Sequence, residues 1–370
     1  MSASYLENYH DEYCIFKVCH SYEKHITYML TGICHMYDDN GVIKLYTHDG
    51  YVTLDASAID ILTCYQEDDV LSINEQGIIY CLYNSLSGDN ALLFTMQCNS
   101  NCIMCPCSEN SRRHGQHRSA EELITVIKYL PADVAHLTLT GGEPTLLQDD
   151  FFQFLTYVQQ HRSDIHYQLL TNGRAFGDYR FTERFVSCLP DNIDIGIPIY
   201  GYDSQTHDSI TRAPGSFKEA IIGIHNLLHY HINIEVRIVL TKMNVDFLDK
   251  IAAYIVKYIP GVHKVAFMGL ELMGNAAKNM ADVWVPYEEA AQKSEKAIRY
   301  LIANGINVQI FNIPLCKVPR NLWDICAMSI TDYKVQYNDG CEGCTVKNIC
   351  GGIFDSTKRM AKLTTSPITE

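Results

Sequence analysis

A repeated order of strand, loop and helix runs through residues 90–311 and limits the folds open to this chain. Short apolar runs in this region are each followed by a loop and an amphipathic helical pattern. Short connections between alternating strands and helices favour a parallel sheet. Six visible units predict an α/β fold, a partial (β/α)6 TIM-type barrel with its active site at the carboxyl ends of the strands. Strands are expected at residues 91–96, 135–140, 166–171, 192–200, 235–240, 262–270 and 307–311.

Two helices of this repeat carry start signals. Ser119 and Glu122 form a capping-box pattern ahead of an apolar stripe. Ser216 and Glu219 repeat the pattern and predict a helix that continues to His231.

The segments on either side of the repeat differ from it. Residues 1–88 hold short β-type runs between Asn-Gly and Asp-Gly turns, which predict a small β-rich N-terminal module. Residues 312–357 form an irregular cysteine-rich extension, and the polar residues 358–370 are expected to be a disordered tail. The α/β core is then residues 89–311.

Charge and hydropathy narrow the range of partners. The formal net charge is −14, whereas non-specific nucleic-acid binding and attraction to an anionic membrane both need a positive surface. We therefore predict neither a nucleic acid nor a membrane as partner. The first residues lack the pattern of a signal peptide, and no run of about 18 apolar residues is present. These features predict a cytoplasmic protein.

Three cysteines, Cys98, Cys102 and Cys105, directly follow the first strand of the repeat. Disulfides are rare in cytosolic proteins, so a compact group of thiols indicates a metal site. Thiolates ligate iron–sulfur clusters, and one loop can present three of them to a single cluster. A zinc site with Cys107 as fourth ligand and a set of buried structural thiols are the alternatives.

The Cys-x3-Cys-x2-Cys spacing resembles the cluster loop of radical S-adenosylmethionine (SAM) enzymes. That resemblance implies a 4Fe–4S cluster on Cys98, Cys102 and Cys105. The fourth iron would bind SAM, and an electron from a donor such as flavodoxin or ferredoxin would cleave SAM to a 5′-deoxyadenosyl radical. No residue is assigned as catalytic beyond these ligands.

Motifs at later strand ends resemble the SAM site of the same superfamily. A Gly-Gly-Glu-Pro turn follows the second strand, a Thr-Asn-Gly turn the third, and a His-Asp segment the fourth. Glycines allow close approach of a ligand, Glu143 would accept hydrogen bonds from the SAM amino group, and Arg212 would pair with a carboxylate. Tyr200 stands near the position of the usual serine. The SAM-binding residues that this resemblance implies are Gly141, Gly142, Glu143, Pro144, Asn172 and Arg212.

The second cysteine group, Cys341-x2-Cys344-x5-Cys350, precedes two glycines. It resembles the C-terminal half of the SPASM or twitch extensions, which implies an auxiliary 4Fe–4S cluster. Because one cube takes four thiolates when no substrate binds it, a fourth ligand is needed. Cys316 is the candidate and Cys326 the alternative. A zinc knuckle on the same thiols remains a competing interpretation.

Longer segments resemble the HxsC family of His-Xaa-Ser system radical SAM maturases. They lie at residues 90–95, 98–105, 141–145, 313–316, 322–323, 329–334 and 341–354. The resemblance implies an oxidoreductase that modifies a ribosomally made precursor peptide with His-x-Ser repeats, together with a second radical SAM maturase. A radical SAM enzyme acting on a small molecule and a non-catalytic iron–sulfur scaffold or sensor are the alternatives.

Overall fold

The computed structural model describes residues 4–6, 9, 11–331 and 334–369. Its core is an eight-stranded sheet in the order β15-β14-β13-β12-β11-β10-β9-β8, in which every neighbouring pair is parallel. The strands are β8 (Ala91–Leu93), β9 (His136–Thr140), β10 (His166–Leu170), β11 (Ile193–Pro198), β12 (Asn233–Val239), β13 (Lys264–Met268), β14 (Asn307–Phe311) and β15 (Cys326–Ala327). The predicted α/β fold with a partial barrel is confirmed.

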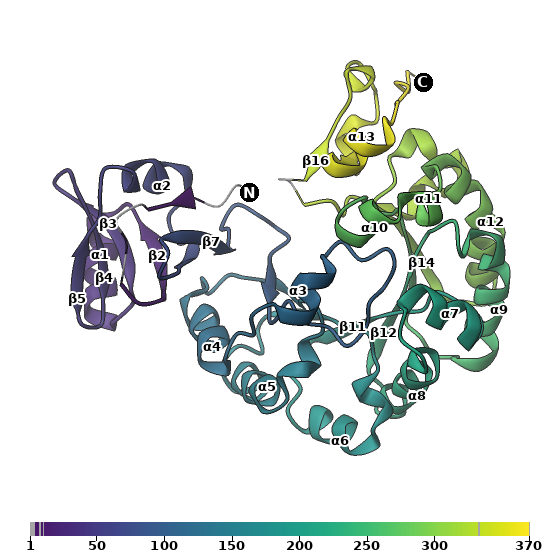
Figure 1. Ribbon diagram of the computed structural model, residues 1–370, viewed down its shortest axis with the longest axis horizontal. Helices are drawn as coiled ribbons and strands as arrows, with labels where there is room; N and C mark the ends of the chain where they lie inside the picture. Colours follow the sequence, from purple (N-terminus) through teal and green to yellow (C-terminus); the bar gives the residue numbers. More distant parts are fainter. Residues whose placement is uncertain (1–3, 7–8, 10, 332–333, 370) are drawn as a thin grey trace.

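Helices cover the outer face of this curved sheet, as Figure 1 shows. They are α4 (Ala120–Tyr129), α5 (Asp149–His161), α6 (Tyr179–Ser187), α8 (Ser216–His229), α9 (Leu248–Tyr258) and α12 (Tyr287–Ala303). Side chains alternate along a strand, so Ile193, Ile195 and Ile197 of β11 lie on one face of the sheet, where all three are buried. The site-bearing strand ends are therefore carried by a rigid core.

Capping was predicted correctly at one helix and wrongly at another. Ser119 and Glu122 exchange both capping-box hydrogen bonds at the start of α4. At α8 the cap residue is Gly215, and Ser216 is already the first helical residue. The second capping box is therefore wrong, and α8 ends at His229 rather than His231.

The N-terminal module is a second sheet, of seven strands in the order β1-β7-β6-β2-β3-β4-β5. Its elements are β1 (Ser4–Tyr5), β2 (Cys14–Cys19), α1 (Tyr22–Thr31), β3 (His35–Asp39), β4 (Val42–Thr47), β5 (Gly50–Thr53), α2 (Ala58–Cys64), β6 (Val70–Ile73) and β7 (Ile78–Tyr83). It meets the core at α4, where the N–H of Cys34 donates to the Tyr129 hydroxyl at 3.1 Å. The predicted β-rich module is present.

Short elements complete the carboxyl side of the sheet and the extension. They are α3 (Glu109–His114), α7 (Ser204–Thr211), α10 (Gly274–Lys278), α11 (Met280–Val283), β16 (Val335–Gln336), β17 (Ile353–Phe354) and α13 (Asp355–Ala361). Within the described ranges, no helix has the length and apolar character needed to cross a bilayer.

Disorder was expected for residues 358–370, but the structure shows residues 358–361 in a helix and residues 363–369 against the extension; residue 370 lies outside the described residues. Helix α13 begins at Asp355 and ends at Ala361, and Lys362 turns the chain in a left-handed conformation. Residues 363–369 then lie against the cysteine-rich extension, where the carbonyl of Leu363 accepts a hydrogen bond from the Asn338 side chain at 2.8 Å. Composition missed this order because the segment is held by backbone hydrogen bonds rather than by an apolar stripe.

Candidate active site

The cluster loop, residues 98–107, leaves β8 and crosses the carboxyl edge of the sheet. Hydrogen bonds to two other segments fix its path: the N–H of Ile103 donates to the carbonyl of Ile210 at 2.9 Å, and the N–H of Asn275 donates to the carbonyl of Cys105 at 2.9 Å. The loop is therefore held between α7 and α10, over the strand ends where the sequence placed it.

Residues at the start of α10 fit closely against this loop. A Cβ on Gly274 would lie 2.1 Å from the carbonyl oxygen of Pro106, and the φ angle of Gly274 is +56°. Asn275 donates from its side chain to the carbonyl of Cys102 at 3.1 Å. Asn275 was missed from sequence, although its position shortly after a strand end was an available signal.

The three thiols of the cluster loop are shielded from water by their surroundings. Burial raises the pKa of Cys98 to about 11 and that of Cys102 to about 12. A hydrogen bond from the Cys107 thiol lowers the pKa of Cys105. Metal binding deprotonates such thiols, so loading of this site is expected to release protons.

The guanidinium of Arg112 is buried beside these thiols and bears on whether an anionic cluster fits the site. Arg112 is 3% exposed, and it hydrogen-bonds the carbonyl of Cys107 and the side chain of Asn101. Its Nε has no hydrogen-bond partner, and in the described part of the chain no carboxylate forms an ion pair with it. A buried charge needs a counter-charge. Thiolates bearing an iron–sulfur cluster would supply it, so the donor set fits the group.

The spacing of the thiols also bears on the zinc alternative. In the residues that the structure describes, no three His, Cys, Asp or Glu side chains gather closely enough to hold one metal ion. Around zinc, thiolates at about 2.3 Å from the ion lie close together. A 4Fe–4S cube separates its thiolates more widely, because each one binds a different iron.

The Gly-Gly-Glu-Pro turn is packed against the chain that leads into the cluster loop. The N–H of Gly142 donates to the carbonyl of Thr95 at 2.7 Å. A Cβ on Gly142 would lie 2.1 Å from the carbonyl oxygen of Gln97, and one on Gly141 would lie 2.4 Å from that of Thr95. The absence of side chains at Gly141 and Gly142 therefore lets residues 95–97 of the same chain pack against the turn. Pro144, which is buried, opens the short 3-10 helix that follows.

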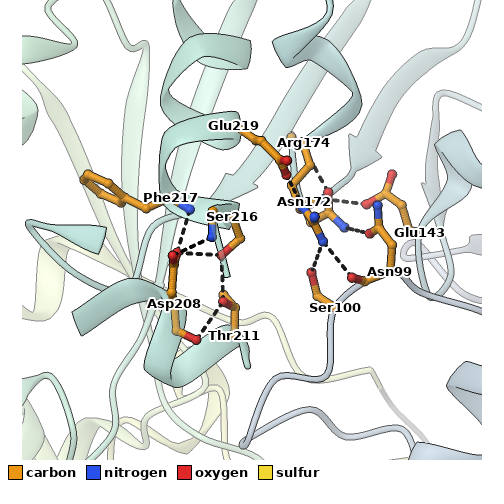
Figure 2. Close-up of polar contacts among 12 residues, drawn as sticks. Asn99, Ser100, Glu143, Asn172, Arg174, Asp208, Thr211, Ser216, Phe217 and Glu219 are labelled. Carbon is orange, nitrogen blue, oxygen red and sulfur yellow. Dashed lines mark hydrogen bonds and ion pairs between the residues drawn. The ribbon is translucent and has the colours of Figure 1, made fainter. Parts of the chain in front are cut away.

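Glu143 differs most from its expected role. Its side chain is fully buried; Oε1 accepts from the hydroxyls of Thr145 and Thr171, both at 2.7 Å, and Oε2 accepts from the N–H of Asn172 at 2.6 Å. Burial raises the pKa of Glu143. The carboxylate ties the end of β9 to the end of β10 (Figure 2). It therefore positions Asn172 and does not face an open site.

Asn172 and Arg174 connect the end of β10 to the cluster loop. Asn172 donates from Nδ2 to Asn99 Oδ1 at 2.6 Å and lies 3.9 Å from the sulfur of Cys98. Arg174, which the sequence analysis missed, donates to the carbonyl of Asn99 at 2.6 Å and pairs with Glu219 at 2.5 Å. Figure 2 shows this group converging on the loop. The position of Arg174 directly after the Thr-Asn-Gly turn was a signal that could have identified it.

The side chain of Asp208, and not that of Ser216, binds the N–H groups at the start of α8. Its carboxylate accepts the N–H of Gly215 at 2.7 Å, the N–H of Phe217 at 2.8 Å and the Ser216 hydroxyl at 2.9 Å (Figure 2). Arg212, between α7 and α8, has a left-handed backbone and donates to Asn279 at 3.3 Å.

Of the predicted SAM-binding residues, Arg212 lines a recess that it shares with a thiol of the cluster loop. Cys98, Arg174 and Arg212 all line it, and its volume is about 640 Å³ including its open mouth. Arg174 is paired with Glu219, whereas no carboxylate in the described residues pairs with Arg212. The recess can therefore receive an anionic group beside Cys98.

Tyr200 lies where the usual serine is absent. It is buried, and burial together with the neighbouring thiols of Cys102 and Cys105 raises its pKa. Its N–H donates to Nδ1 of His207 at 3.1 Å, and burial lowers the pKa of His207 to about 4, which keeps that ring neutral. The phenol is thus a polar side chain next to the cluster loop that motif matching did not assign.

The second cysteine group also converges. Cys316, Cys341, Cys344 and Cys350 line a single cavity, whose volume is about 350 Å³ including its open mouth. Cys326 is not among its lining residues, and its thiol donates to the carbonyl of Leu322 at 3.4 Å. The structure therefore places Cys316, the predicted fourth ligand, in one cavity with Cys341, Cys344 and Cys350.

Comparison with known proteins identifies the core. The model of the radical SAM superfamily matches residues 92–255, from β8 into α9. The chain contains a radical SAM domain. Such a domain implies a 4Fe–4S cluster and SAM, and Cys98, Cys102 and Cys105 are the thiols in it that fit the cluster.

Two curated relatives and one solved structure resemble the radical SAM domain and its surroundings. The mycofactocin maturase MftC of Mycolicibacterium smegmatis is 27% identical over 218 residues, which cover 58% of this chain and 51% of MftC. The sporulation killing factor maturation protein SkfB of Bacillus subtilis is 26% identical over 223 residues, 59% of this chain and 51% of SkfB. This chain spans about half the length of the curated relatives it matches. SuiB of Streptococcus suis, crystallised with S-adenosylmethionine, shares the fold at 12% identity, with a TM-score of 0.50 over 61% of this chain and 51% of SuiB.

A mutation at Glu143 tests the positioning role assigned to it. Glu143→Gln would turn amide hydrogens toward groups that are themselves donors, and a buried unmatched polar pair costs about 1–3 kcal/mol. We expect the free energy of unfolding to fall by about that amount in denaturant titrations. Glu121→Gln, on the exposed side of α4, is the matched control and should change little. Equal stability of the two variants would contradict the assignment.

Proposed function

We propose that this chain is a radical SAM maturase that modifies a ribosomally made peptide. The observation that carries the proposal is the cluster loop, whose three thiols are fixed over the strand ends beside the unpaired buried cation of Arg112. Two relatives named as maturases, MftC and SkfB, support a peptide as substrate.

Each candidate residue has a role in this proposal. When bound, the 4Fe–4S cluster supplies the electron that splits SAM into methionine and a 5′-deoxyadenosyl radical. Cys98, Cys102 and Cys105 hold three of its irons. Arg212 binds the SAM carboxylate from the recess beside Cys98, and Asn172 is held in place by Glu143.

The glycine turn contributes through its backbone. Gly141, Gly142 and Pro144 shape the chain at the end of β9, where their carbonyl groups would face SAM. The N–H groups of Gly142 and Glu143 already donate to the carbonyls of Thr95 and Gln97, at 2.7 and 2.8 Å. This leaves the edge of the turn, rather than the Glu143 side chain, as the part that binds the SAM amino group.

We further propose an auxiliary 4Fe–4S cluster on Cys316, Cys341, Cys344 and Cys350. The four thiols line one cavity, and four thiolates complete a cube. Cys316 is preferred over Cys326 because only the former lines that cavity. The cysteine-rich extension would then correspond to a SPASM or twitch-like unit.

We further propose that the chain acts in a His-Xaa-Ser peptide system. This proposal is supported by the resemblance of short segments, at residues 90–95, 98–105, 141–145, 313–316, 322–323, 329–334 and 341–354, to the HxsC family. We propose a precursor peptide with His-x-Ser repeats as substrate, a second radical SAM maturase as partner, and flavodoxin or ferredoxin as electron donor. The bond made or broken in the peptide is left open by these residues.

Incubation with a candidate precursor tests the peptide proposal. The anaerobically reconstituted protein, SAM and dithionite would be mixed with a synthetic His-x-Ser peptide and analysed by intact-mass spectrometry. We expect a mass change that requires SAM and is accompanied by 5′-deoxyadenosine. A peptide with its His and Ser residues replaced by Ala is the control. An unmodified peptide, with 5′-deoxyadenosine still formed, would favour a small-molecule substrate.

A further inference from the structure

The C-terminal segment, residues 363–369, runs along one side of the second cysteine cavity. Besides the Asn338–Leu363 hydrogen bond, the N–H of Thr345 donates to the carbonyl of Ile368 at 2.8 Å. Between these two anchors, a Cβ on Gly340 would lie 2.7 Å from the carbonyl oxygen of Thr365. The segment therefore follows the cysteine loop closely.

This segment contacts two thiols of the cavity through hydrogen bonds and lines the cavity beside a third. The Thr365 hydroxyl lies 3.3 Å from the sulfur of Cys341, and the N–H of Ile368 donates to the sulfur of Cys344 at 3.5 Å. Ser366, which lies between Thr365 and Ile368, lines the same cavity as Cys316.

The fourth thiol has a donor from elsewhere in the extension. The N–H of Leu315 donates to the sulfur of Cys350 at 3.4 Å. Three of the four cysteines thus have a hydrogen-bond partner at the sulfur, and two of these partners belong to residues 365–368. Thiolates at Cys341, Cys344 and Cys350 would accept these hydrogen bonds.

Donors to ligand sulfurs have two known effects on iron–sulfur sites. They orient and retain the ligands, and the loss of such partners typically weakens metal binding by about 10–100-fold. They also stabilise the more negative, reduced state, which raises the reduction potential.

We propose that the C-terminal segment is the outer wall of the auxiliary cluster, retaining it in the protein and raising its reduction potential. This inference rests on the proposed auxiliary cluster. Residues 363–369 pack against the cavity rather than trailing from α13, and Thr365, Ser366 and Ile368 are among the residues that line it.

A deletion tests retention. The background is the full chain with Cys98, Cys102 and Cys105 changed to Ala, which leaves the auxiliary site as the iron–sulfur site. Deleting residues 363–370 in this background should make a chelator remove iron at least about tenfold faster. Equal rates would overturn the inference. If the background protein with its segment intact binds no iron, the auxiliary cluster itself is refuted.

A point substitution tests the potential without shortening the chain. Thr365→Val keeps the side-chain shape but removes the hydroxyl near Cys341. Thr364→Val is the matched control, because Thr364 is the adjacent threonine and is exposed. Redox titration followed by EPR should give a lower midpoint potential for Thr365→Val and an unchanged one for Thr364→Val. Equal potentials in both variants would contradict the role of Thr365.

Discussion

Changing Cys102 to alanine is expected to abolish SAM cleavage. Cys102 is half-buried in the cluster loop and is fixed through its carbonyl by Asn275. A cube held by two thiolates would not be retained, so iron should fall from about 8 to about 4 per chain. The formation of 5′-deoxyadenosine with dithionite and SAM should fall to the level without protein.

Cys107→Ala is the matched control for this change. Cys107 lies on the same loop and hydrogen-bonds Cys105, yet it is not a ligand in the proposed cluster. We expect this variant to keep about 8 irons per chain and to form 5′-deoxyadenosine. A reversed pattern, with Cys102→Ala active and Cys107→Ala inactive, would contradict the assignment.

Changing Cys316 to alanine is expected to remove the auxiliary cluster alone. Cys316 shares one cavity with Cys341, Cys344 and Cys350, and a cube that loses one of four thiolates is weakened strongly. Iron should fall to about 4 per chain, whereas SAM cleavage by the remaining cluster should persist.

Cys326→Ala provides the comparison within the extension. Its thiol bonds the Leu322 carbonyl within its own turn, so iron content should stay near about 8 per chain. Metal analysis separates the zinc alternative, since a zinc knuckle would give about one zinc with about 4 irons. Loss of iron in Cys326→Ala but not in Cys316→Ala would reverse the ligand assignment.

The parts of the fold that were predictable depend on local patterns. Apolar runs of strand length and the Ser119–Glu122 capping box are encoded in neighbouring residues, and the structure has strands and a helix there. The three cysteines of the cluster loop are likewise close in sequence. Their position after β8 followed from the strand–loop–helix order alone.

The parts that were missed depend on contacts between distant segments. Ser216 and Glu219 have capping-box spacing, but Asp208 takes the cap and Glu219 pairs with Arg174. The short strand β15 exists only because the extension pairs with β14. Its two residues carry no strand signal of their own.

Charge and composition also could not predict which residues contact distant segments of the chain. Arg112 is one of three consecutive basic residues at the end of α3, a pattern typical of an exposed helix end. In the structure it is buried against the cluster loop. The polar composition of the tail predicts disorder, whereas in the structure the N–H of Ile368 donates to the sulfur of Cys344. In both cases the partner lies in a segment that the local pattern does not reveal.

The most direct test of the central claim is the measurement of 5′-deoxyadenosine from the reconstituted protein. The chain would be loaded anaerobically with iron and sulfide, its metal content measured, and SAM and dithionite added. The proposed function predicts 5′-deoxyadenosine that requires both SAM and dithionite and is absent in Cys102→Ala. A protein that holds about 8 irons per chain but forms no 5′-deoxyadenosine would contradict it.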